Sequence, residues 1–79
     1  MNRKEIPEHQ KKRFLILSTY LRELRFAEGL SQQELSVLVG MHRNTIINAE
    51  GMCNLTVLSL FELSDALDIN PRELFSLID

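Results

Sequence analysis

Four residues in a short stretch of the chain carry side chains suited to reading nucleic-acid bases. An arginine can form paired hydrogen bonds with guanine, an asparagine can do the same with adenine, and an isoleucine can contact the methyl group of thymine. At helical spacing the four share one side of a helix, and they are Arg43, Asn44, Ile47 and Asn48. The stretch therefore predicts an exposed helix face that contacts base edges. The alternatives are a phosphate contact for Arg43 and an ordinary surface position for Asn44.

Catalytic and metal-binding patterns are missing from the sequence. No nucleophile lies near a base, no glycine-rich phosphate loop occurs, and no carboxylates are paired as in an acid–base site. The single cysteine, Cys53, cannot form an internal disulfide, and we expect it to be a small loop residue. The two histidines, His9 and His42, have no metal-ligand spacing. The sequence therefore predicts neither an enzyme nor a bound cofactor or metal.

The base-reading stretch follows a second short helix that has clear start and stop signals. Ser31 and Glu34 have the spacing of a capping box, in which each side chain bonds the other residue's backbone N–H. Gly40 is suited to end the helix because glycine adopts the left-handed conformation without strain. The helix between them is expected to place one apolar face inward, formed by Leu35, Leu38 and Val39.

The two helices are separated only by a tight turn. Residues 43–50 form the second of them, with Ile46 and Ala49 facing inward. Two short helices joined by a glycine turn are typical of a helix-turn-helix, whose second helix enters the major groove of DNA.

The stretch "LRELRFAEGLSQQELSVLVGMHRNTIINAE" closely resembles the lambda-repressor/Cro-like family, also called XRE. The resemblance covers residues 21–75 and implies a five-helix, all-α DNA-binding domain. It implies that Arg43, Asn44, Ile47 and Asn48 contact bases. Gln32 matches a glutamine that braces the backbone and the base-contacting side chains, and Gln33 opens the same helix, where phosphate contact is also expected.

The resemblance also assigns three structural positions. Arg25 and Glu50 match a buried pair that ties the first helix to the end of the third. His42 stands where relatives often have a capping serine, so we expect it to cap the helix or face solvent, with phosphate contact as the alternative. The family commonly places basic residues after the third helix. Here Met52, Cys53, Asn54 and Leu55 follow, so phosphate affinity must come from Arg43, the lysines near residue 11 or the N-terminal arm.

The rest of the chain is predicted to form three more helices. The first is expected to end at Gly29 and to bury one face, formed by Phe14, Leu17, Leu21 and Leu24. Residues 1–10 are expected to be an N-terminal arm or the start of this helix. Residues 11–79 are expected to form one helix-turn-helix domain. Leu15, Ile16 and Phe26 lie off its buried face, as scattered surface residues or as a stripe that contacts a partner. Thr56 is expected to cap the fourth helix and Asn70 the fifth. Inward positions are predicted at Val57, Leu60, Phe61, Ser64, Leu67, Leu74 and Phe75.

The last two helices also resemble the matching stretch of restriction-modification controller proteins and small helix-turn-helix antitoxins, in which they form a two-fold dimer. By this resemblance, Leu55 and Leu58 lie at the dimer interface, with Leu77 or Ile78 beside them. An apolar patch on a small domain is compatible with such an isologous contact. For Leu55, packing into its own core is the alternative.

Charge is distributed unevenly along the chain, whose net charge is −2. Residues 1–43 carry eight Lys and Arg against five Glu, a net +3, whereas residues 44–79 carry only Arg72 against six acidic residues, a net −5. The basic half is expected to face a phosphate backbone.

No apolar run is long enough for a membrane span or a signal peptide, so a cytoplasmic location is expected. Together these features predict a dimeric bacterial or phage transcription regulator that binds a palindromic operator in double-stranded DNA; the alternative is a protein-interaction module such as an antitoxin-like partner.

Overall fold

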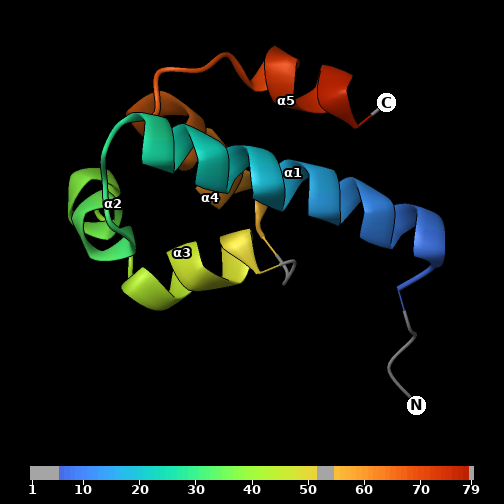
Figure 1. Ribbon diagram of the computed structural model, residues 1–79, viewed down its shortest axis with the longest axis horizontal. Helices are drawn as coiled ribbons and strands as arrows, with labels where there is room; N and C mark the ends of the chain where they lie inside the picture. The colour runs from blue at the N-terminus through green and yellow to red at the C-terminus, as the bar shows by residue number, and fades with distance from the viewer. Residues whose placement is uncertain (1–5, 52–54, 79) are drawn as a thin grey trace.

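The computed structural model describes residues 6–51 and 55–78, which form five α-helices. They are α1 (Glu8–Ala27), α2 (Gln32–Val39), α3 (Arg43–Glu50), α4 (Val57–Ala66) and α5 (Pro71–Leu77). α1 runs through the middle of the molecule, with α5 on one side of it and α3 on the other, and α2 crosses one end (Figure 1). The all-α, five-helix prediction is confirmed. Cys53 lies outside the described residues, as do Met52 and Asn54 of the loop without basic residues.

Side-chain caps begin α2, α4 and α5 at the residues that the sequence predicted. Ser31 and Glu34 form the complete capping box: the Ser31 hydroxyl accepts from the Glu34 N–H at 3.0 Å, and the Glu34 carboxylate accepts from the Ser31 N–H at 2.8 Å. Thr56 caps α4 by accepting from the Ser59 N–H, and Asn70 caps α5 by accepting from the Arg72 N–H. α1 starts after Pro7, so residues 8–10 are helical rather than part of an arm.

Three of the helices end in a residue with positive φ. Gly29 (φ 68°) and Gly40 (φ 80°) follow α1 and α2, as predicted. Asp68 (φ 56°) has the same place after α4, and the Ile69 N–H donates to the Ser64 carbonyl across the turn. This 6→1 hydrogen bond is the Schellman arrangement, which reverses the chain directly after a helix.

The core is built almost entirely from leucine. Its buried apolar side chains are Leu17, Leu21, Leu35, Ile46, Ala49, Leu60, Leu63, Leu67 and Leu74. Three buried serines, Ser18, Ser36 and Ser64, each donate to a carbonyl in the preceding turn of their own helix, so no polar group is left unpaired there. This core fixes the positions of α2 and α3 against α1 and α4.

Four of the predicted inward positions are wrong. The buried side of α2 is centred on Leu35 and Ser36, so Leu38 falls at its edge and is 59% exposed. The buried side of α4 includes Leu63, which the sequence pattern missed. Val57 and Phe61 consequently lie on the outer side of α4, at 61% and 44% exposure. On α5, Leu74 is fully buried whereas Phe75 is 48% exposed, because a helix of seven residues has only one turn in contact with the core.

Candidate nucleic-acid interface

The outer face of α3 carries the four side chains predicted to contact bases. Arg43, Asn44, Ile47 and Asn48 are all exposed, while Ile46, Ala49 and Glu50 lie on the opposite, buried side. Within the described residues, none of the four side chains has a hydrogen bond or an ion pair. The helix therefore offers a guanidinium, two amides and one apolar group to a partner, and their donors and acceptors are not used within the fold.

His42 caps the start of α3. Its Nδ1 accepts a hydrogen bond from the Asn44 N–H at 3.0 Å. An imidazole nitrogen can accept a hydrogen bond only while it carries no proton. Capping therefore requires an unprotonated Nδ1. An imidazole ring that carries both protons, as one in contact with a phosphate would, cannot make this cap.

The turn between α2 and α3 is tight, and two of its backbone N–H groups donate to the same carbonyl. The Gly40 and Met41 N–H groups both donate to the Ser36 carbonyl, at 2.9 and 3.0 Å. Gly40 takes the left-handed conformation that this geometry needs. The turn places the solvent side of α2 beside the first residues of α3.

A buried ion pair joins α1 to the end of α3. The Arg25 Nε donates to Glu50 Oε2 at 2.7 Å and its Nη2 donates to Oε1 at 2.9 Å, while its Nη1 donates to the Leu30 carbonyl at 2.8 Å. Both side chains are buried. The hydrogen bonds with the Glu50 carboxylate raise the pKa of Arg25, and burial opposes them less strongly. The last residue of α3 is thereby fixed to the body of the molecule.

Gln32 extends this network to α2. Its Nε2 donates to Glu50 Oε1 at 3.2 Å, so α1, α2 and α3 meet at one carboxylate. Gln32 is the first residue of α2 and is partly buried, whereas Gln33 beside it is exposed. The second N–H and the carbonyl oxygen of the Gln32 amide remain available to a ligand at the start of α2, where backbone N–H groups also favour an anion.

A hollow of about 520 Å³ lies between α2 and the start of α3. It brings together Gln33, His42, Arg43 and Asn44, which the sequence had assigned to the interface from different helices. It also includes Val37, which sequence reasoning missed and which is 71% exposed. The signal in the sequence was that Val37 is an apolar residue on the polar side of α2, close to the turn.

Comparisons with known proteins agree with this geometry. No family model matches the sequence, and no curated protein matches it either. Among solved structures, the restriction-modification controller protein C.AhdI from Aeromonas hydrophila has 43% sequence identity and a TM-score of 0.71; the match covers 78% of this chain and 96% of that one.

The chain belongs to the restriction-modification controller proteins. Two further structures share the fold. C.Esp1396I bound to a 19 base pair DNA duplex has 22% identity and a TM-score of 0.72, with 84% of this chain and 89% of that chain covered. A hypothetical transcription factor from Neisseria, NHTF, has 25% identity and a TM-score of 0.71, with 94% and 83% covered.

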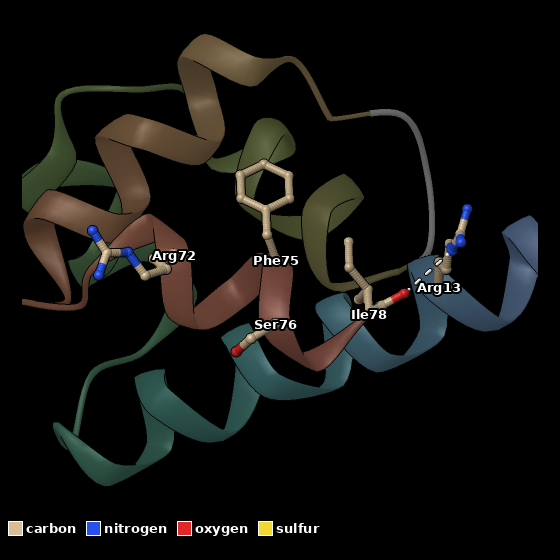
Figure 2. A pocket seen from close by; sticks show the side chains of 5 residues that line it. All are labelled: Arg13, Arg72, Phe75, Ser76 and Ile78. Carbon is tan, nitrogen blue, oxygen red and sulfur yellow. Dashed lines mark hydrogen bonds between the residues drawn. The ribbon is translucent and has the colours of Figure 1, made fainter.

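This controller protein has a second set of predicted residues, on α4, on α5 and directly beside these two helices. Leu58 and Leu77 are exposed, whereas Leu55 and Ile78 are partly buried against the core. The Ile78 carbonyl accepts from the Arg13 Nε at 3.2 Å, as Figure 2 shows, so Arg13 holds the end of α5 against α1. Figure 2 also shows Phe75 pointing away from α1, on the same side of α5 as α4.

The described part of the chain was examined for a membrane-spanning helix and for a metal-binding cluster. None of the helices in residues 6–51 and 55–78 combines the length and apolar character that a membrane crossing requires. The same residues contain no group of three His, Cys, Asp or Glu side chains able to hold a metal ion.

Proposed function

We propose that this controller protein is a sequence-specific DNA-binding transcription regulator that acts by binding and not by catalysis. The observation that carries the proposal is the free outer face of α3, whose four base-reading side chains have no partner within the described residues. A helix offered to the major groove needs such a face, with its first residues directed at base edges. The DNA-bound C.Esp1396I structure, which shares the fold, supports this assignment.

In this arrangement α3 enters the major groove and α2 crosses the backbone. Arg43 and Asn44 reach bases first, and Asn48 and Ile47 reach them one turn later. Gln33 and the second N–H of Gln32 meet a phosphate at the start of α2, where the helix dipole favours an anion. The Arg25–Glu50 pair keeps α3 at a fixed angle while these contacts form.

Electrostatics make a single copy a weak DNA ligand. The chain has a net charge of −2, and six of its eleven acidic residues follow residue 43. Few phosphates can be neutralised by one copy, and phosphate neutralisation supplies much of the affinity of DNA-binding proteins. Two copies on one operator double the contacts, so the regulator is proposed to act as a homodimer on a palindromic site.

The exposed apolar residues of α4 and α5 support a dimer interface formed by these two helices. Val57, Leu58 and Phe61 follow one another along the outer side of α4, and Phe75 lies on α5, with exposed fractions from 44% to 67%. Contiguous apolar area of this kind on a small domain is typical of a contact between copies. Leu58, the most exposed of them, is the proposed centre of the interface, with Leu55 and Ile78 supporting it from the core. Leu77, which lines a hollow with Leu15 and Ile16 of α1, is proposed to lie at its edge.

Enrichment of random duplex DNA on the purified protein tests the proposal and gives the operator. We expect a two-fold symmetric sequence to be enriched, and Asn44→Ala and Asn48→Ala to weaken its selection. Ser76→Ala is the control, because Ser76 is exposed on α5, which lies across α1 from α3 (Figure 1). If no duplex is enriched at moderate salt, the protein-interaction alternative replaces DNA binding.

A further inference from the structure

One exposed face of α1 combines positive charge with large apolar groups. Lys12, Leu15 and Ile16 lie within one turn of each other on the side of α1 that points away from the core. Leu15 is 50% and Ile16 is 43% exposed, and neither contributes to the core. Lys12 has no ion pair within the described residues, whereas Lys11 pairs with Glu8 at 3.6 Å and Arg13 is bound to Ile78. We call these three residues the α1 stripe.

A groove with the opposite charge lies between α2 and α4. Its volume is about 310 Å³ and it is lined by Leu38, Val39, Glu62, Asp65 and Ala66. Leu38, which the helical pattern had placed inside, is 59% exposed and forms an apolar side of this groove. Glu62 and Asp65 are one turn apart on α4, and within residues 6–51 and 55–78 neither carboxylate has an ion pair or a side-chain hydrogen bond. We call this the α2–α4 groove.

We propose that the α2–α4 groove of one copy binds the α1 stripe of a second copy. The groove offers apolar walls with two free carboxylates, and the stripe offers two large apolar side chains beside a free ammonium group. The same complementarity holds for the whole chain, because residues 1–43 carry +3 and residues 44–79 carry −5. DNA is excluded from the groove, since its phosphates would meet the two carboxylates.

This contact is head-to-tail and differs from the proposed two-fold dimer. The stripe and the groove are different surfaces, so each copy keeps one free stripe and one free groove after a contact forms. Such heterologous contacts build rings or open chains and do not stop at pairs. Neither surface includes Leu58, Phe75 or the outer residues of α3. The stripe adjoins one residue of the proposed two-fold interface, because Leu77 lines a hollow with Leu15 and Ile16.

Charge reversal tests the contact by sedimentation velocity. Lys12→Glu and Asp65→Lys change exposed side chains without a described partner, so both variants are expected to fold. At low salt the wild type should form species larger than a dimer. Each variant should lower that association constant about tenfold, because like charges then meet across the interface. Added salt should weaken the wild-type association, since exposed charges are screened.

Mixing the two variants gives the decisive comparison. The mixture restores opposite charges at both kinds of contact, since an unchanged Lys12 can meet an unchanged Asp65 and the new glutamate can meet the new lysine. It should therefore regain the large species that neither variant forms alone. Arg22→Glu, an exposed charge reversal on α1 outside the stripe, should behave as the wild type. The inference is overturned if the wild type forms nothing larger than a dimer, if Arg22→Glu has the same effect as Lys12→Glu, or if the mixture sediments like its separate components.

Discussion

The Arg25 guanidinium and the Glu50 carboxylate meet through two hydrogen bonds of 2.7 and 2.9 Å, although the residues are 25 positions apart in the sequence. Arg25 lies in the last turn of α1 and Glu50 is the last residue of α3. The pair is buried, and Gln32 donates to the same carboxylate. The end of the proposed DNA-reading helix is therefore held by a polar contact within the fold as well as by the packing of Ile46 and Ala49 in the core.

Removing one member of this pair should be costly. Glu50→Ala leaves a buried guanidinium without its partner, so the free energy of unfolding should fall by ~3–5 kcal/mol. Urea-induced unfolding followed by circular dichroism measures this change. Glu28→Ala, which removes an exposed carboxylate, should change stability by less than about 0.5 kcal/mol. A loss below about 1 kcal/mol for Glu50→Ala would mean that the pair behaves as a surface ion pair in solution.

Base contacts should be separable from general DNA affinity. Asn44→Ala and Asn48→Ala should each weaken binding to the best operator by ~1–3 kcal/mol but hardly change binding to random DNA, because an amide that pairs with a base gives discrimination. Fluorescence anisotropy with both duplexes measures the two affinities. Equal losses on both duplexes would assign these side chains to phosphates, and intact specific binding would contradict a base contact.

Dimerisation should depend on Leu58. Leu58→Glu places a charge at the centre of the proposed α4–α5 interface, so the variant should lose the two-fold dimer while its far-UV helicity stays unchanged. Light scattering after size exclusion at high salt, where the charge-dependent α1 contact is screened, measures the mass. Val37→Glu is the control, because Val37 is equally exposed but lies on α2. A wild type that is monomeric at high concentration would contradict the interface.

The operator should show the spacing that a two-fold dimer imposes. Half-sites about 10 base pairs apart, or a multiple of that, place both major grooves on one face of the duplex. Inserting about five base pairs between them turns one half-site to the opposite face, so tight binding should be lost, whereas inserting about ten should restore much of it. A gel-shift series over these duplexes measures the effect. Equal affinity at all spacings would indicate that copies bind independently.

The capping box should make stability depend on pH. The hydrogen bonds that Glu34 accepts from Ser31 lower its pKa in the folded state. Its stabilising contribution is therefore complete above the unfolded-state pKa of the carboxyl and is lost as the pH falls through the lower folded-state pKa. Glu34→Gln keeps a cap but does not titrate. The stability difference between wild type and Glu34→Gln should therefore shrink on acidification, as thermal unfolding would show; a difference that is constant with pH would contradict this.

Local signals in the sequence predicted most of the helix boundaries, although they left the start of α1 open. Ser31, Thr56 and Asn70 begin helices, and Gly29 and Gly40 end them, because caps and positive-φ residues act through neighbouring backbone atoms. Burial was harder to predict. Leu38, Val57 and Phe61 match a helical period, but each lies at the edge of the apolar face of its helix. A side chain at such an edge is buried only if a neighbouring helix packs over it. Those contacts are between segments far apart in the chain, so the local pattern does not contain them.

In the candidate nucleic-acid interface, too, local positions could be predicted from the sequence but contacts between helices could not. The exposed positions on α3 could be predicted because Ile46 and Ala49 fix which side of this short helix is buried. The hydrogen bond from Gln32 to Glu50 joins α2 to the end of α3, 18 positions along the chain, so it depends on how the helices pack. Val37 joins the interface for the same reason, since its neighbours in the hollow come from the other helix.

The separation of the two sides of α3 bears on how such a regulator changes through evolution. The outer side chains at positions 43, 44, 47 and 48 are exposed and have no described bond to the rest of the chain, while the inner side and Glu50 hold the helix in place. Substitutions on the outer side are therefore expected to alter the preferred operator at little cost in stability. One scaffold of this kind is therefore expected to tolerate many different outer faces, each with its own operator preference.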